Sequence, residues 1–202
     1  MKHTLLFSIL FASLTSLAQY KDSLKRFRKL TKTYQKSSDF AFIPSGSYQR
    51  VENDQNYMQK DVVGFYVRAH SVSIDSFFMG KFEISNEKYL EFVNDKIKED
   101  SILGTSFLPD TLVWRRPEGW GEKYTEYYLR HPAYQNFPVV GVSYTQAKAY
   151  AEWLTEKHNT DEKRVFKHVR FRIPTEEEWE YAYKGGLGYS YLPWGSSSTL
   201  DH

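Results

Sequence analysis

The stretch FRIPTEEEWEYAYKGG, residues 171–186, places four glutamates and four aromatic residues in front of a glycine pair. Thr175 and Glu178 have the T-x-x-E spacing of a capping box, in which each side chain binds the other residue's backbone N–H. The remaining glutamates of the first turn favour the positive end of the helix dipole. Gly185 can adopt the left-handed conformation that ends a helix. The stretch therefore predicts a helix over 175–184.

One face of this expected helix is apolar. Trp179, Ala182 and Tyr183 recur at helical spacing, so we expect all three to point inward. Helix physics accounts for most of the glutamates. A carboxylate pair for general acid–base catalysis is the alternative reading of the same residues.

Composition bounds the class of protein. The chain has 202 residues, of which 16 are Tyr, 14 Phe and 5 Trp, enough aromatic side chains to build a sizeable core. Its net charge of +2 gives no global field for binding nucleic acid, and we expect no nucleic-acid partner. Cysteine is absent, which excludes disulfides, thiolate metal ligands and cysteine nucleophiles within these residues.

The first eighteen residues are typical of a secretory signal peptide. A short polar start precedes the apolar run TLLFSILFASL, which is too short to span a bilayer. SLA before Gln19 fits a cleavage site after Ala18. We therefore expect residues 1–18 to be a signal peptide, and the protein to be exported to the periplasm or cell envelope. A buried N-terminal helix is the alternative.

Residues 19–38 form the next expected segment, a basic amphipathic helix followed by a short linker. Leu24, Phe27, Leu30 and Tyr34 recur at helical spacing, and residues 20–38 hold seven Lys or Arg against one Asp. The basic part, residues 20–36, can lie on an anionic membrane surface. A solvated helix that packs one thin stripe on its own domain is the favoured alternative.

The rest of the chain alternates short strands and helices. Strands are expected from residue 40 to 84, a helix capped by Ser85, and an irregular aromatic segment over 100–138 that is pinned to the core. FPVVGVSYTQAKAYAEWL then indicates a strand and a helix capped by Ser143 and Gln146. KRVFKHVRFRIP, residues 163–174, is strand-like and basic. The pattern alone supports a loop-rich α+β fold.

Four ordered segments carry a family resemblance. FRIPTEEEWEYAYKGGLG…LPWG resembles the R-L-P-T-E-x-E-W-E-Y-A-x-R-G-G…P-W-G signature of the formylglycine-generating enzyme, or sulfatase-modifying factor, family. FAFIPSGSY is similar to its I-P-x-G-x-F opening, FFMGKFEISNEKYLEFVN to its E-V-T-N-x-x-Y-x-x-F-V segment, and FPVVGVSYTQAKAYAEWL to H-P-V-V-x-V-S-W-x-x-A-x-x-Y-x-x-W. LPDTLVWRR and YTEYYLRHPAYQNFPVVGVSY resemble the non-catalytic gliding-motility and type IX secretion members of Bacteroidetes.

The resemblance implies the irregular α+β fold of that family, related to C-type lectins. Residues 39–202 correspond to the N-terminal portion of the domain, so we expect it to be truncated on its C-terminal side. Catalytic members use a late cysteine pair with copper, and relatives hold calcium mostly in the later part. We expect no cofactor in this chain.

Candidate binding residues lie mainly in the aromatic segment. We expect Trp114, Arg115, Trp120, His131 and Trp194 to line a groove for an extended peptide or glycan. Core packing is the favoured alternative for each tryptophan, and a hydrogen bond to backbone is the favoured alternative for His131.

Three functions are consistent with these observations. The first is an exported non-catalytic scaffold or binding component of an envelope machine, with other envelope or secretion proteins as partners. The second is the front part of a copper-dependent oxidase that converts a sulfatase cysteine to formylglycine. The third is a peptide- or glycan-binding module.

Overall fold

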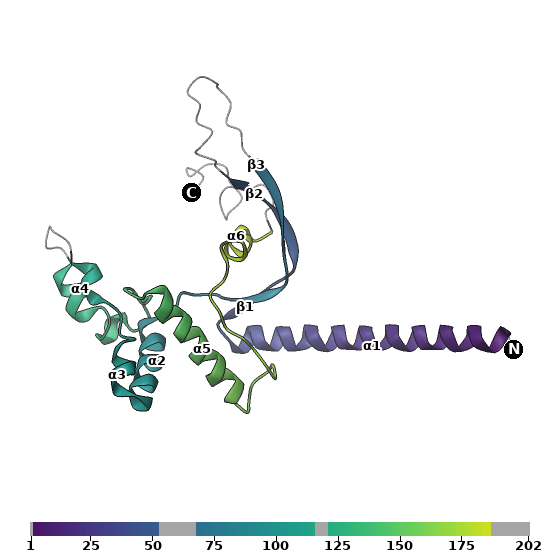
Figure 1. The fold of residues 1–202 in the computed structure, drawn as a ribbon, viewed down its shortest axis with the longest axis horizontal. Helices are drawn as coiled ribbons and strands as arrows, with labels where there is room; N and C mark the ends of the chain where they lie inside the picture. The colour runs from purple at the N-terminus through teal and green to yellow at the C-terminus, as the bar shows by residue number, and fades with distance from the viewer. Residues whose placement is uncertain (1, 53–67, 116–120, 187–202) are drawn as a thin grey trace, which may run out of the picture. The chain divides into compact units, whose positions relative to one another are not determined.

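The computed structural model describes residues 2–52, 68–115 and 121–186, which fold as two compact units. Unit 1 comprises residues 1–40 and 82–172, and unit 2 comprises residues 41–81 and 173–202. Figure 1 labels most of the elements, which are α1 (Lys2–Ser37), β1 (Phe40–Ile43), β2 (Gly46–Glu52), β3 (Arg68–Ile74), β4 (Phe77–Gly80), α2 (Asn86–Glu99), α3 (Ser101–Thr105), η2 (Thr111–Trp114), α4 (Glu122–Tyr127), η3 (Pro132–Tyr134), α5 (Tyr144–Thr160) and α6 (Glu176–Lys184).

The core of unit 1 lies between α2 and α5. Tyr89, Phe92 and Val93 of α2 are almost fully buried and pack against Tyr150 and Trp153 of α5. The Phe92 ring lies 5.7 Å from the Tyr150 ring and 5.6 Å from the Trp153 ring, and the Tyr150 pair is edge-to-face. Burial raises the pKa of both Tyr89 and Tyr150 to about 12. The predicted caps are confirmed: Ser85 caps α2, and Ser143 with Gln146 forms a capping box on α5.

The long helix α1 joins unit 1 through its C-terminal turns. Thr31 and Tyr34 are buried, and the Tyr34 ring lies 5.2 Å from Phe166 and 5.9 Å from His158. The expected amphipathic helix over 20–36 is thus present, and its last part packs one thin stripe on its own domain. In the described part of the chain, no helix is both long and apolar enough to cross a membrane.

Two predicted strands are wrong. Residues 163–174 have no strand structure, and side chains of α5 bind the backbone groups of Val169 and Phe171 instead. The Asn159 side chain both donates to the Val169 carbonyl and accepts from the Val169 N–H, each at 2.9 Å, and Thr155 binds Phe171 in the same way. Residues 137–142 contribute a single bridge, Ser85 with Pro138.

The expected irregular segment over 100–138 contains more structure than predicted. It folds into the short helices α3 and α4 and the 3-10 turns η2 and η3. α3 packs on α2 and η2 packs on α4, and Asn86 of α2 binds the carbonyls of Tyr128 and Tyr134. For the described part of this aromatic segment, the expectation that it is fixed to the core is confirmed.

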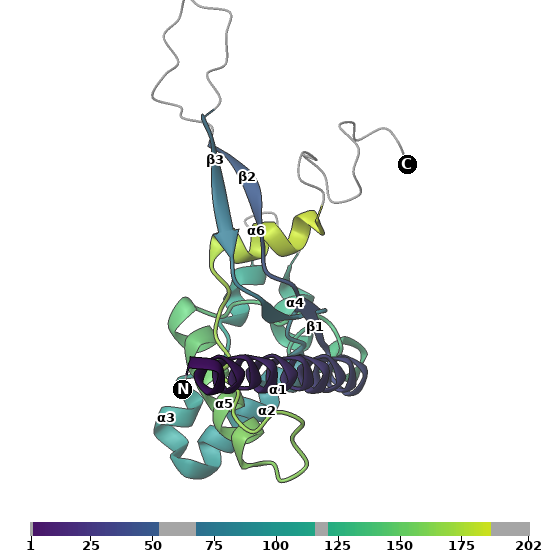
Figure 2. The same cartoon turned by 90° about the vertical axis from the view of Figure 1, so that its right-hand side faces the viewer.

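Unit 2 is built from two two-stranded sheets and α6. β1 pairs with β4, and β2 pairs antiparallel with β3 in a register that sets Gly46 opposite Ile74 and Arg50 opposite His70. The β2–β3 ribbon curves, and α6 lies on its inner side (Figures 1 and 2). Gly46 allows this approach, because a Cβ there would lie 2.3 Å from the Tyr181 hydroxyl.

The opening stretch forms α6 as its sequence predicts. Thr175 and Glu178 make the reciprocal capping box, and Gly185 ends the helix with φ of 57°. One expectation is wrong: Trp179 is 52% exposed and Tyr183 is 41% exposed. The two rings stack on each other, 5.1 Å apart and 16° from parallel, so they contact one another instead of filling a core.

Candidate functional site: a groove beside the aromatic segment

The aromatic segment of unit 1 folds into a continuous cluster of rings. Trp114 lies 4.7 Å from Tyr128 and 5.4 Å from Tyr124, centroid to centroid. Tyr134 in turn lies 5.4 Å from Tyr128 and 5.5 Å from Phe137. Aromatic pairs at these separations stabilise a fold beyond the area that they bury. The cluster therefore makes a loop-rich segment rigid enough to present a defined surface.

Asn86 holds this segment against α2. Its side chain is fully buried, and its amide nitrogen donates to the carbonyls of Tyr128 and Tyr134, each at 2.9 Å. The backbone N–H groups of Asn86 and Glu87 donate to the carbonyls of Phe137 and Gln135. Four hydrogen bonds thus fix residues 128–137 to the first turn of one helix. Sequence reasoning gave Asn86 no role; its signal was its place in the S-N-x-x-Y part of the family resemblance.

A groove of about 370 Å³ runs between α2 and this segment. One wall is the outer face of α2, and the other is the turn from Leu129 to Gln135. The lining residues are Glu87, Leu90, Glu91, Asn94, Leu129, Arg130, His131, Pro132 and Gln135.

Opposite charges face the groove from its two walls. Glu87 and Glu91 are on α2, and Arg130 is on the turn. Glu91 pairs with Lys157 of α5. Within the described ranges, neither the Glu87 carboxylate nor the Arg130 guanidinium forms an ion pair. Both charges are exposed and available to a ligand.

His131 has a structural role at the edge of the groove. Its Nδ1 accepts the Ala133 N–H at 3.2 Å and so caps η3. Its ring lies edge-on to Tyr127 and Tyr134, at 6.2 and 6.1 Å. The predicted alternative, a hydrogen bond to backbone, is confirmed.

The other predicted groove residues have different positions. Trp114 belongs to the ring cluster and Arg115 binds Glu122 at 2.8 Å, an interaction that raises the pKa of Arg115. Neither lines the groove of His131. Trp120 and Trp194 lie outside the described residues. The structure thus connects Trp114 to His131 through Tyr128 and Tyr134, with the groove on the His131 side.

The glutamates of α6 form a separate cluster in unit 2. Arg50 of β2 binds Glu176 at 2.7 Å, Glu177 at 2.8 Å and Glu180 at 3.4 Å. The hydrogen bond to Glu176 raises the pKa of Arg50. The Tyr48 hydroxyl donates to Glu180, and burial together with this bond raises the pKa of Tyr48 to about 12.

This cluster gives the acidic stretch a structural role. A general acid needs a carboxyl group with a raised pKa. The pKa of Glu177 is instead lowered, chiefly by its backbone N–H and then by the Thr175 side chain, with Arg50 adding to the effect. These carboxylates join the helix to the ribbon. Sequence reasoning missed Arg50, which is 127 residues away from Glu177 along the chain.

The described residues were compared with the donor sets that bind metal ions in proteins. In the parts of the chain that the structure describes, no three His, Asp or Glu side chains lie together as a metal site. The sequence offers no thiolate for copper.

Comparison with known proteins agrees with this fold. Residues 26–202 match the family model described as the sulfatase-modifying factor enzyme 1-like domain. The chain therefore belongs to this family, and its α+β architecture is that of a formylglycine-generating-enzyme-like domain.

Similar curated proteins include both active and inactive members. The formylglycine-generating enzyme of Mus musculus is 27% identical over 181 residues, covering 76% of this chain and 42% of the relative. That of Thermomonospora curvata is 28% identical, covering 78% and 52%. The inactive C-alpha-formylglycine-generating enzyme 2 of Bos taurus is 30% identical over 152 residues, covering 62% and 43%. The chain thus spans about half the length of these relatives.

Proposed function

We propose that this chain is a non-catalytic binding component of a bacterial envelope machine, of the kind used for gliding motility or type IX secretion. It is exported, and it recognises an extended peptide segment of another envelope protein. The groove between α2 and the 129–135 turn carries this proposal, because it sets unpaired charges of opposite sign on a rigid frame.

The geometry suits an extended peptide. Arg130 offers a planar, bidentate donor for a carboxylate, and Glu87 can accept an ammonium or guanidinium group. Leu90, Leu129 and Pro132 add apolar lining to the same groove. A segment with an acidic and a basic side chain on one face complements all three features. The wall is held by backbone hydrogen bonds, so binding orders few protein groups and costs little conformational entropy.

The absence of cysteine supports a binding role over a catalytic one. The family's oxidation needs thiols, and the residues in hand have none. A relative named as inactive is 30% identical to this chain, so the domain also occurs without activity.

A titration with defined peptides tests the proposal. The first peptide carries one Lys and one Glu on the same face, and the second replaces both with Gln; a cell-wall oligosaccharide forms a third arm. We expect the charged peptide to bind, and Arg130→Gln to weaken it about 10–100-fold, the usual worth of a charge-assisted hydrogen bond.

The matched control is Lys123→Gln, an exposed charge on α4 that does not line the groove. It should leave binding unchanged. Equal binding of charged and neutral peptides, or an Arg130→Gln protein that binds like the control, would refute the peptide proposal. Binding of the oligosaccharide alone would support the glycan-binding alternative instead.

The second candidate function is the front portion of an oxidase that makes formylglycine. It is favoured by the relatives named formylglycine-generating enzyme, which match over 181 and 183 residues. The discriminating observation is the gene sequence beyond codon 202. A continuing reading frame with a cysteine pair would support the oxidase, and a continuing frame without one would support the binding component.

A further inference from the structure

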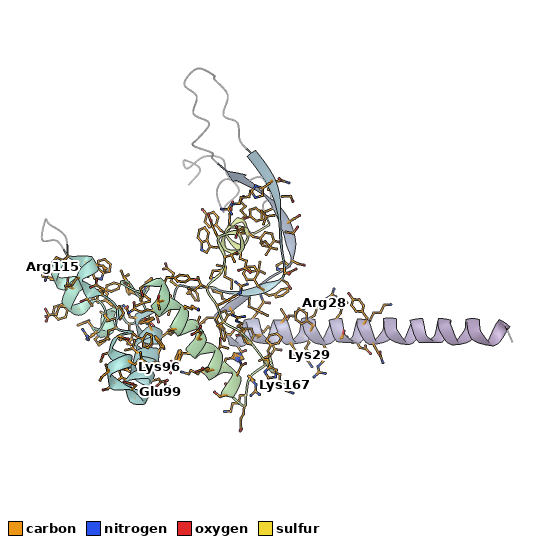
Figure 3. The ribbon with its side chains drawn as sticks, viewed as in Figure 1. Arg28, Lys29, Lys96, Glu99, Arg115 and Lys167 are labelled. Atoms are coloured by element: carbon orange, nitrogen blue, oxygen red, sulfur yellow. The ribbon has the colours of Figure 1, made fainter. Side chains whose placement is uncertain are left out.

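Unit 1 carries a second feature, a basic surface made by two segments far apart in the sequence. The first is α1, with exposed cations at Lys21, Lys25, Arg26, Arg28, Lys29, Lys32 and Lys36. The second is the loop that follows α5, with exposed Lys163, Lys167 and Arg170. Figure 3 labels Arg28 and Lys29 on the helix and Lys167 on the loop.

Packing brings the two segments together within the unit. Phe166 of the loop lies edge-to-face on Tyr34 of α1, with centroids 5.2 Å apart. Phe171 lies 5.2 Å from Phe40, just beyond the end of α1. The Arg164 side chain holds the loop's shape by donating to the carbonyls of Asp161 and Lys167. The apolar side of the loop therefore faces the helix, and the loop places three exposed cations, Lys163, Lys167 and Arg170, beside it.

The direction of the helix face follows from its period. Thr31 and Tyr34 are buried against the unit. Lys21, Lys25, Arg28 and Lys32 are spaced at i, i+4, i+7 and i+11, so they share one side of the helix. At 100° per residue, these four side chains lie about 80–140° around the helix axis from the buried stripe. Lys29 and Lys36 lie almost opposite that stripe. The cations thus point away from the protein.

The exposed cations of the two segments differ from other lysines of unit 1 in their ion pairing. Over the residues that the structure describes, none of the ten exposed side chains forms an ion pair, although Lys residues elsewhere in unit 1 do so. The acidic residues nearest in sequence are Asp22 on the helix, Asp39 just beyond it, and Asp161 and Glu162 at the start of the loop. All four are exposed, and Asp39 pairs with Lys88, which leaves three. Ten unpaired cations against three carboxylates leave a strong local excess of positive charge.

We infer that this two-segment basic surface docks unit 1 on an anionic phospholipid bilayer. An extended row of cations on a helix and a flanking loop matches a planar array of phosphates, whereas a small anion would need a pocket. Binding is electrostatic, because the apolar stripe of α1 packs on the protein and only its charged side is left to contact the lipid headgroups. The surface is separate from the groove and from its proposed peptide.

Vesicle binding tests the inference on the full chain. Sedimentation is measured with vesicles of phosphatidylcholine alone and with vesicles that also contain phosphatidylglycerol. The ratio of the two partition coefficients is the readout, because the apolar residues before Gln19 would contribute to both. We expect a ratio well above one that falls as salt is raised.

Two variants separate the contributions. Lys163, Lys167 and Arg170 are changed to Gln together in the loop variant. Each cation near an anionic surface is worth about fivefold in partitioning, so the ratio should fall at least tenfold. The control changes three exposed lysines on other helices of unit 1 to Gln, which are Lys98, Lys123 and Lys148.

The outcomes divide clearly. A loop variant with a reduced ratio, beside a control with an unchanged one, supports a single surface made of both segments. A loop variant that binds like the control would overturn the inference, since the helix alone would then explain binding. Equal partitioning of the unaltered chain into both vesicle types would also overturn it. Circular dichroism confirms that each variant keeps its helices.

Discussion

Replacing Asn86 by Ala should destabilise unit 1 more than its small size suggests. The side chain is 0% exposed and donates two hydrogen bonds of 2.9 Å to carbonyls of the 128–134 segment. An unsatisfied buried acceptor costs about 1–3 kcal/mol. The site at the Tyr134 carbonyl is only partly buried, so water can replace that bond in part. We therefore expect a loss of about 2–4 kcal/mol, a large share of the roughly 5–15 kcal/mol of a typical domain.

Urea unfolding followed by tryptophan fluorescence measures this loss. The control is Asn94→Ala, an exposed change on the same helix, for which we expect less than about 0.5 kcal/mol. Peptide binding in the groove should weaken with Asn86→Ala, because the wall of Arg130 loses its attachment. A midpoint equal to that of Asn94→Ala, with an unchanged slope, would show that Asn86 does not hold the segment.

The remaining predictions concern unit 2 and the end of α5. Arg50→Gln should lower the melting temperature, measured by circular dichroism, and an unchanged value would refute a stabilising role for the cluster. Thr175→Ala should cost about 0.5–2 kcal/mol in urea unfolding through the lost cap. Trp179→Ala should lower the free energy of unfolding by about 1–2 kcal/mol, less than the loss of a fully buried ring would, since Trp179 is 52% exposed. A larger loss would show that the ring is buried. Burial lowers the pKa of His158 below 6.5, so its contribution to stability is full above about pH 6.5 and is lost as pH falls through the folded pKa. In His158→Gln the free energy of unfolding should therefore change less between about pH 7 and 5 than in the unaltered protein. An equal pH dependence in the two proteins would contradict this.

Local sequence signals predicted the helices well. Ser85, Ser143 with Gln146, Thr175 with Glu178, and Gly185 all occupy the cap positions that their spacing indicates. Capping depends on side chains and backbone within one turn, so a single sequence contains the needed information. The first strands from residue 40 were likewise readable from β-branched and aromatic residues next to a turn.

Long-range contacts were not readable in the same way. Residues 163–174 have strand-like composition, but Asn159 and Thr155 satisfy their backbone from a helix. Trp179 has the spacing of a core residue, yet it stacks on Tyr183 at the surface.

The candidate site shows the same limit. His131 was singled out from its sequence context, and its backbone hydrogen bond was among the expectations. Its groove depends on Asn86 and Glu87, which lie more than 40 residues earlier in the chain. In the sequence these two residues look like the polar first turn of an ordinary helix. Only the fold shows that Arg130 and Glu87 face the same space.

The measurement that tests the central claim most directly is an activity assay on this chain. The protein is incubated with copper and a peptide that contains a sulfatase-type cysteine, and the peptide mass is then determined by mass spectrometry. A non-catalytic binding component leaves the cysteine intact, because these residues supply no thiol to bind copper or exchange with substrate. Formylglycine above the level of a control without protein would contradict the account.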